Sequence, residues 1–218
     1  MKKSLRAALA LLLALLTVAA PLSAAASEAL GEDLTSQTTA LHRTAQLSTN
    51  VFWSTTYSDL RTENLITYTP GGEVTPLVSY GSVLTSCSTV SSAAKDLEAQ
   101  GYRVVAGING DFYNTGTGLP IGLVVSDGEV KSSDGGYYAI GFHADGSAVL
   151  GKPALSISAD LGYTLADESG YETEVVRKIT GINKARVSSG GIYLYTYDFN
   201  SRHTTGNTEA GVDVICSV

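Results

Sequence analysis

The feature that most constrains the fold is the close spacing of turn signals in the second half of the chain. Asp127-Gly128 and Asp145-Gly146 each separate two short runs rich in apolar residues. An Asp-Gly pair in this position is a strong signal for a tight β-hairpin, because such turns need positive φ angles. We therefore predict two hairpins, with the strands Ile121–Ser126, Glu129–Ser132, Tyr137–His143 and Ser147–Leu150.

Further short runs of strand-forming residues surround these hairpins. The run Arg103–Ile108 is apolar without alternation, which is typical of a strand buried on both faces of a sheet. The other predicted strands are Val51–Tyr57, Asn64–Tyr68, Val74–Val78, Ala154–Ala159, Gly191–Tyr197 and Val212–Cys216. One helix is predicted over Thr89–Gln100, with Ser88 or Thr89 as its N-cap and Gly101 after its end. The pattern predicts an α+β fold with a mixed, mainly antiparallel sheet and few helices.

The first 26 residues have the three parts of an export signal. Lys2, Lys3 and Arg6 precede the apolar run Ala7–Ala20, and Ala24-Ala25-Ala26 resembles a cleavage site. The run is shorter than the roughly 20 apolar residues that span a bilayer, which favours a cleaved signal over the alternative, an uncleaved membrane anchor. We expect a secreted or cell-surface protein that meets a membrane only through residues 1–26, before cleavage.

Residues 27–50 are polar, rich in Thr and weakly patterned. We predict a leader or linker here, with a short helix near Leu41, followed by a domain over residues 51–218.

Composition and motifs exclude several classes of function. The formal net charge of −7 argues against nucleic-acid binding, because a negative field repels phosphate backbones. No nucleophile-elbow, zincin or phosphate-loop motif occurs, and the spacing of Gly116, Gly118 and Gly122 does not fit a dinucleotide fingerprint. With scattered histidines and no C-x-x-C pair, we expect neither a metal nor another cofactor. Cys87 and Cys216 either pair after export or stay as two buried thiols, the alternative that we favour.

Polar residues follow the predicted strand Arg103–Ile108. Asn109 and Asp111 flank Gly110, and Phe112 adds an aromatic wall. An Asp in this position can act as a base or stabilise a cationic transition state. The alternative is that Asn109 and Asp111 only make turn hydrogen bonds.

Several blocks of the sequence resemble, in order, those of the phosphodiester glycosidase family. The blocks are Gly107-Ile108-Asn109-Gly110-Asp111-Phe112-Tyr113, Gly118–Gly128, Ala139–Phe142 with Asp145-Gly146, Gly181–Arg186 and Leu194-Tyr195-Thr196. The resemblance extends from about Asn64 to the C-terminus. The family's domain continues to a later D-G-G-G-S block, which this sequence does not contain. We therefore expect an incomplete domain, with its C-terminal part missing, or a degenerate member of the family.

The resemblance implies hydrolysis of the bond between a sugar's anomeric carbon and a phosphodiester oxygen. It implies that Asp111 and Asn109 carry catalysis, with Asp111 stabilising an oxocarbenium-like centre or directing a water. It further implies that Arg186 grips the phosphate through its guanidinium fork. The remaining residues implied in substrate binding are Asn183, Gly110 and Gly122. For Arg186 the alternative is a surface ion pair with an acid such as Glu172 or Glu174.

We expect an exported phosphodiester glycosidase that acts on carbohydrate phosphodiesters, specifically sugar-1-phosphate diesters, in a role suited to cell-wall or exopolysaccharide metabolism. Because the later block is missing, activity is expected of the full-length protein rather than of this chain alone. The alternative from another class is a non-catalytic glycan-binding or structural β-rich module of a larger surface protein.

Overall fold

A computed structural model describes residues 31–133, 135–164, 172–173, 175–187 and 189–216. The predicted signal peptide, residues 1–26, lies outside the described residues. The chain divides into two compact units, residues 1–68 and 69–218. Within the described ranges, one helix accompanies strand pairs that are antiparallel with a single parallel exception, which confirms the predicted α+β fold. No helix in these ranges is long and apolar enough to cross a membrane.

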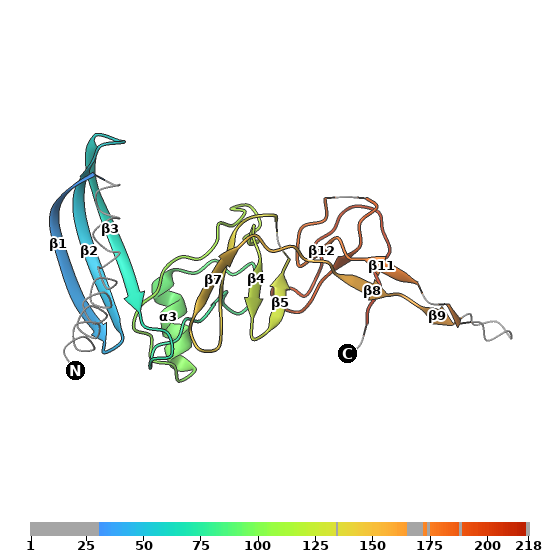
Figure 1. The fold of residues 1–218 in the computed structure, drawn as a ribbon. Coiled ribbons are helices and arrows are strands. Elements are labelled where there is room, and N and C mark those ends of the chain that lie inside the picture. Colours follow the sequence, from blue (N-terminus) through green and yellow to red (C-terminus); the bar gives the residue numbers. More distant parts are fainter. Residues whose placement is uncertain (1–30, 134, 165–171, 174, 188, 217–218) are drawn as a thin grey trace, which may run out of the picture. The chain divides into compact units, whose positions relative to one another are not determined.

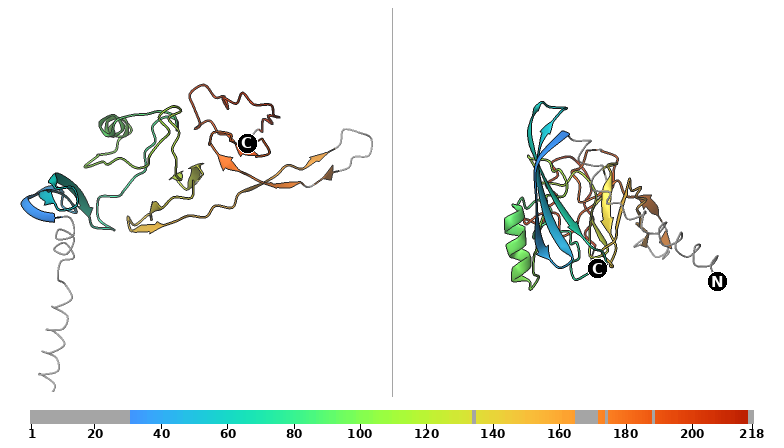
Figure 2. Two further views of the ribbon diagram at one scale, coloured as in Figure 1. Left: turned by 90° about the horizontal axis from the view of Figure 1, so that it is seen from above. Right: turned by 60° about the vertical axis from the view of Figure 1, so that its left-hand side comes forward.

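The first unit contains a three-stranded antiparallel sheet in the order β1 (Gly31–His42), β2 (Ala45–Ser54) and β3 (Asp59–Tyr68). Figures 1 and 2 show the three strands side by side as one curved layer. Residues 45–54 pair with residues 59–68 without interruption. Because β2 and β3 form one continuous ladder, the boundary between the compact units follows Tyr68.

Residues 31–50 differ from the prediction, because they form β1 and the first part of β2 instead of a leader with a helix near Leu41. The segment lacks apolar alternation because polar side chains face each other across the strands. Ser36 Oγ donates to Asn50 Oδ1 at 2.7 Å, and the hydroxyls of Thr38 and Ser48 lie 3.0 Å apart. The β-branched Thr residues favour an extended backbone, so residues 31–50 form strands although most of their side chains are exposed or half-buried.

The second unit contains the helix and both predicted hairpins. Helix α3 (Val90–Ala99) is capped by Thr89, whose hydroxyl accepts a hydrogen bond from Ser92 N at 3.2 Å. The hairpins are β4 (Val124–Ser126) with β5 (Glu129–Ser132), and β6 (Ala139–Phe142) with β7 (Ala148–Gly151). Asp127 and Gly128 have φ angles of 53° and 79°, as the predicted turn requires.

The remaining strands of the second unit are short. β8 (Ser158–Asp160) pairs with β11 (Val176–Lys178), and β9 (Tyr163–Thr164) pairs with β10 (Glu172–Thr173), both antiparallel. β12 (Gly181–Ile182) and β13 (Tyr193–Leu194) form the parallel pair. The hydrophobic core of this unit is formed by Leu84, Leu119, Val124 and Phe199, with Tyr80 and Tyr195 packed against them. The core therefore joins segments near residues 80, 120 and 197, which lie far apart in the sequence.

Three predicted strands are wrong, because Val74–Val78, Arg103–Ile108 and Val212–Cys216 are not strands in the structure. In two of these runs the apolar side chains are also exposed instead of buried in a sheet, since Ile108 is 76% exposed and Ile215 is 97% exposed. An apolar run becomes a strand only where a neighbouring strand satisfies its backbone groups, and no described segment pairs with these three.

The two cysteines are unpaired, as in the alternative that we favoured. Cys87 and Cys216 are both exposed, however, which makes the expectation of buried thiols wrong.

Candidate functional site

The loop that begins at Asp111 brings two of the predicted site residues together. One carboxylate oxygen of Asp111 accepts a hydrogen bond from Phe112 N at 2.7 Å, and the other accepts one from the backbone N–H of Gly122. A Cβ atom at residue 122 would lie 2.8 Å from Asp111 Oδ2, so any other residue here would displace the carboxylate from this close approach. The carboxylate therefore connects the two ends of the loop.

Residues 112–121 fold back on themselves between these ends. Ile121 N donates to Phe112 O at 3.0 Å, and Asn114 N donates to Leu119 O at 2.9 Å. The side-chain oxygen of Asn114 accepts hydrogen bonds from the backbone N–H groups of Gly116 and Thr117. The sequence builds this turn locally, since Asn readily accepts hydrogen bonds from the backbone two or three residues further on.

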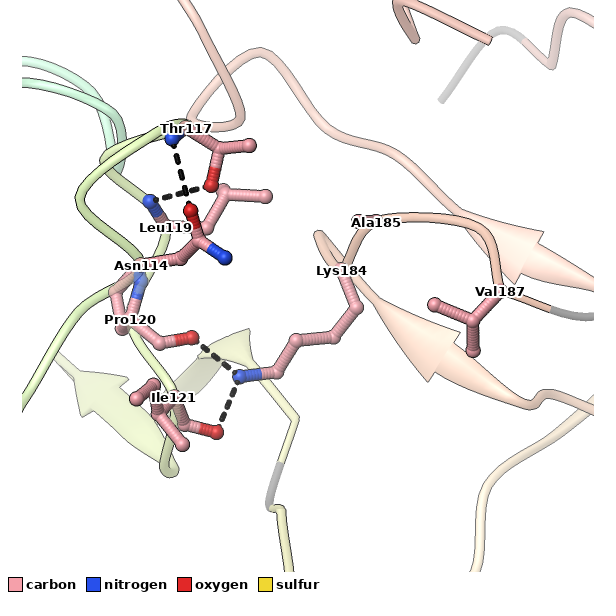
Figure 3. Close-up of a pocket in the computed structure, with 8 residues that line it drawn as sticks. All are labelled: Asn114, Thr117, Leu119, Pro120, Ile121, Lys184, Ala185 and Val187. Atoms are coloured by element: carbon pink, nitrogen blue, oxygen red, sulfur yellow. Dashed lines mark hydrogen bonds between the residues drawn. The ribbon is translucent and has the colours of Figure 1, made fainter.

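Lys184 connects the loop to the segment Gly181–Arg186. Its Nζ atom donates to the carbonyl oxygens of Pro120, Ile121 and Gly122 at 2.7, 2.9 and 3.0 Å. Figure 3 shows the side chain reaching across to the first two of these carbonyls. An ammonium group has three N–H donors, so three converging carbonyls match its hydrogen-bonding capacity. The contact holds the loop at its second end, directly beside the N–H group that binds Asp111.

A pocket of about 290 Å³ lies between these two segments, and we call it the Lys184 pocket. It is lined by Asn114, Thr117, Leu119, Pro120, Ile121, Lys184, Ala185 and Val187 (Figure 3). Its polar side chains are engaged inside the protein: Thr117 Oγ1 accepts from Leu119 N, and Asn114 Oδ1 and Lys184 Nζ form the bonds described above. The few polar groups in this mainly apolar lining therefore already serve the loop.

Asn183 is fully buried and joins three segments of the second unit. Its side-chain amide donates to Lys131 O and to Thr196 Oγ1, both at 2.8 Å, and its side-chain oxygen accepts from Thr196 N at 2.9 Å. Its backbone N–H donates to Leu194 O, and its φ angle is 50°, a left-handed conformation that Asn tolerates better than most residues. With no exposed surface, the side chain directs its polar atoms at the protein and braces the backbone beside Lys184.

Arg186 lies two residues after Lys184 and uses its guanidinium group on backbone carbonyls. Nη2 donates to Ala210 O at 2.8 Å and to Ser189 O at 3.5 Å, and Nη1 donates to Glu209 O at 3.3 Å. It forms no ion pair with a carboxylate that the structure describes. Glu174, one of the alternative partners, lies outside the described residues.

The other two predicted residues, Asn109 and Gly110, lie on the exposed segment before Asp111. A Cβ atom at residue 110 would meet no atom within 4 Å, so this glycine borders open space. Phe112 directly follows Asp111 in the chain, and its aromatic side chain is 84% exposed.

Sequence reasoning gave Lys184 no role and missed an ionic cluster at Lys131. Lys131 Nζ lies 2.6 Å from Glu129 Oε2 and 3.0 Å from Asp198 Oδ2, and Tyr80 donates to Asp198 Oδ1 at 3.2 Å. Hydrogen bonds to Glu129 and Asp198 raise the pKa of Lys131 well above its ordinary range. Burial, followed by the negative charge of Asp198, raises the pKa of Tyr80. Only the position of Lys184 beside Asn183, inside a block that carries the resemblance, could have drawn attention to it.

The carboxylate of Asp111 is held by two backbone donors and is exposed on its other side, so it can accept a hydrogen bond from a water or a hydroxyl group. Within the described ranges, no group of three or more His, Cys, Asp or Glu residues could hold a metal ion. No model of a known protein family matches the chain, and no curated protein or solved structure is similar enough to indicate a relationship.

Proposed function

We propose that the protein is an exported phosphodiester glycosidase that cleaves the sugar–phosphate bond of sugar-1-phosphate diesters, with Asp111 at the reacting centre. The observation that carries the proposal is the meeting of three blocks that resemble this family. The first block contributes Asp111, the second contributes Gly122, and the third contributes Lys184, which binds the carbonyl of Gly122. Segments about 60 residues apart have no local reason to meet, so their contact supports a shared site.

The chemistry that this arrangement supports is electrostatic. A phosphate is a good leaving group, so the main requirement is to stabilise positive charge at the anomeric carbon and to direct a water to it. In the proposal Asp111 does this, and the exposed ring of Phe112 lies beside the sugar. The N–H donors of Phe112 and Gly122 fix the orientation of the carboxylate, which a reacting group needs.

Arg186 and Asn109 complete the proposal as groups that bind substrate. Among the described residues, three hydrogen bonds use the terminal nitrogens of Arg186, which leaves its Nε–H and one Nη1–H for a phosphate oxygen. Asn109 is exposed two residues before Asp111, and in the proposal it holds a sugar hydroxyl.

The test is release of free sugar from a panel of sugar-1-phosphate diesters by the full-length protein. Asp111→Asn should lower turnover by about 100-fold or more, because it removes the negative charge while nearly preserving shape. Asp145→Asn is the matched control, since Asp145 is also an exposed aspartate that accepts a backbone hydrogen bond in a turn, and it should keep full activity.

A second variant tests position instead of charge. Gly122→Ala places a methyl group against the Asp111 carboxylate and should lower turnover about 10- to 100-fold, whereas Gly151→Ala, whose Cβ meets open space, should not. If no diester releases sugar, the enzymatic proposal fails and a binding module remains. If Asp111→Asn keeps wild-type turnover, Asp111 is a turn residue only.

A further inference from the structure

The first unit carries a pocket that the proposed enzymatic function does not use. It has a volume of about 350 Å³ and lies at the turn between β2 and β3. Its lining includes Phe52, Ser54, Tyr57, Arg61 and Glu63, and we call it the Tyr57 pocket. Phe52 and Ser54 are buried, while Tyr57 is 68% exposed, so the pocket has a closed floor and an open aromatic side.

The sheet register places its main groups on one face. Phe52 is opposite Arg61, and Asn50 is opposite Glu63, in the ladder between β2 and β3. Residues directly opposite each other, or two apart on a strand, share a face of a sheet. Trp53, between Phe52 and Ser54, therefore lies on the other face with its partner Leu60.

Hydrogen bonds within the protein orient the polar side chains of this pocket, but they use only part of the hydrogen-bonding capacity of these side chains. Arg61 donates from Nε to Asp59 Oδ1 at 2.7 Å, and its guanidinium carbon lies 4.5 Å from the centre of the Tyr57 ring. Neither terminal nitrogen of Arg61 makes a hydrogen bond to a described residue. Glu63 accepts from Asn50 Nδ2 through Oε2 at 2.9 Å, and within the described ranges its Oε1 accepts nothing. The pocket thus presents N–H donors and a carboxylate acceptor beside an aromatic ring.

The charges around the pocket disfavour an anionic ligand. Arg61 is balanced by Asp59, Glu63 adds a negative charge, and Asp33, opposite Phe52 on the same face, adds another. A phosphate or carboxylate ligand would be repelled by this surplus. A simple cation is also disfavoured beside Tyr57, because the positive guanidinium of Arg61 lies close to that ring and repels a second positive charge. A neutral ligand that both donates and accepts hydrogen bonds suits the pocket, and hydroxyl groups do both.

The polar face continues away from the pocket along the strands. The pairs Ser36 with Asn50 and Thr38 with Ser48 present hydroxyl and amide groups on the face that carries Glu63. This strip can contact further units of an extended, hydroxyl-rich chain.

We propose that the Tyr57 pocket binds a neutral oligosaccharide. One sugar ring lies against Tyr57 and above Phe52, with its hydroxyls accepting from Arg61 and donating to Glu63, while neighbouring sugars lie along the polar strip. The site belongs to the first compact unit and needs no phosphodiester, so it is independent of the proposed enzymatic function.

The experiment measures binding of neutral oligosaccharides to the full chain by NMR titration, observing the Arg61 Nε–H and the Tyr57 ring. The probes are hexasaccharides of β-1,4-glucose, α-1,4-glucose and β-1,4-mannose, with oligogalacturonate as the anionic probe and choline as the cationic one. At least one neutral hexasaccharide should shift both signals. Tyr57→Ala and Glu63→Gln should each weaken its binding about tenfold or more. Trp53→Ala, which removes an exposed aromatic ring from the opposite face, should leave binding unchanged.

Each other outcome overturns the proposal. It is wrong if no neutral hexasaccharide binds, if oligogalacturonate or choline binds more tightly, or if Trp53→Ala weakens binding as much as Tyr57→Ala. None of these probes contains a sugar-1-phosphate diester, so a negative result leaves the proposed hydrolysis untouched, and failure to hydrolyse diesters leaves this site untouched.

Discussion

The Lys184 pocket and the Tyr57 pocket both combine an apolar floor with charged and polar side chains, but they use those side chains differently. In the Lys184 pocket, the ammonium group makes three bonds to carbonyls of the neighbouring loop. In the Tyr57 pocket, Arg61 makes one hydrogen bond and one ring contact, and both terminal nitrogens remain without a partner among the described residues.

The difference separates polar groups that hold the fold from polar groups that can bind something else. Leaving a buried polar group without its hydrogen-bond partner lowers stability by the full desolvation free energy of that group, whereas an exposed ion pair contributes little to stability. Substitutions around the Lys184 pocket should therefore affect stability more than substitutions around the Tyr57 pocket. The free energy of unfolding of the second unit can be followed by amide hydrogen exchange, and that of the first by the fluorescence of Trp53, the single tryptophan.

The largest effect is expected at Asn183, which braces the backbone beside Lys184. Asn183→Ala removes three side-chain hydrogen bonds and leaves a left-handed residue without the side chain that favours it. We expect the second unit to lose about 3 to 4 kcal/mol, measured as faster exchange of the Ile182 and Thr196 amides. Asn109→Ala is the control and should change stability by less than about 0.5 kcal/mol, because Asn109 is exposed. Equal effects of the two variants would contradict the role of Asn183 as a brace.

A smaller loss is expected when Lys184 is replaced. Lys184→Met keeps the apolar stem but removes the bonds to the three carbonyls, which should cost about 2 kcal/mol locally. The amide of Gly122 should then exchange about 30-fold faster, because 1.4 kcal/mol corresponds to a factor of ten. Lys95→Met, on an exposed position of α3, should leave this amide unchanged. Unchanged exchange of Gly122 in Lys184→Met would mean that the loop holds its shape without the lysine.

The ionic cluster at Lys131 should make the second unit sensitive to alkali. The pKa values of Lys131 and Tyr80 are raised in the folded protein above their ordinary values of 10.5 and 10.0. A raised pKa adds stability that is complete below the ordinary value and is lost as the pH rises through the folded-state value. The second unit should therefore lose stability above about pH 10, and Lys131→Met should make that loss shallower. An unchanged slope in Lys131→Met would contradict this prediction.

The smallest effect is expected around the Tyr57 pocket. Arg61→Gln removes an ion pair whose partners are both about half exposed, so the first unit should change by less than about 0.5 kcal/mol. Trp53 emission during urea unfolding measures this, and Trp53 lies on the same sheet. A loss above about 2 kcal/mol would show that Arg61 holds the fold, and the comparison between the two pockets would then fail.

Local signals explain which elements could be predicted. The hairpin at Asp127-Gly128 and the helix capped by Thr89 depend on residues within a few positions of each other, and both are present. The sheet β1–β3 was missed because its polar ladder, such as Ser36 with Asn50, lacks the apolar alternation by which half-buried strands are usually predicted. The strand predicted at Arg103–Ile108 is absent although its sequence is apolar, because an apolar run becomes a strand only where a neighbouring strand pairs with it.

The residues of the candidate sites also fall into those that the sequence indicated and those that only the structure revealed. The importance of the segment around Asp111 and Gly122 was visible as a pattern of polar and glycine residues, and the structure brings these two residues into contact. Lys184, Tyr57 and Arg61 gave no such pattern, because what they do depends on which distant carbonyls and rings lie within reach.

The sequence by itself determined the turns, the helix and the positions at which glycine or asparagine had to stand, because these follow from backbone sterics and from hydrogen bonds between near neighbours. Only the tertiary structure decided how each polar side chain is used. Asn183 and Lys184 hold the backbone because carbonyl groups from far along the chain accept their hydrogen bonds. Arg61 keeps unused N–H donors at a pocket because its neighbours accept only one of its hydrogen bonds. Hydrogen-bond saturation is a property of the surroundings in space, and the order of residues along the chain does not contain it.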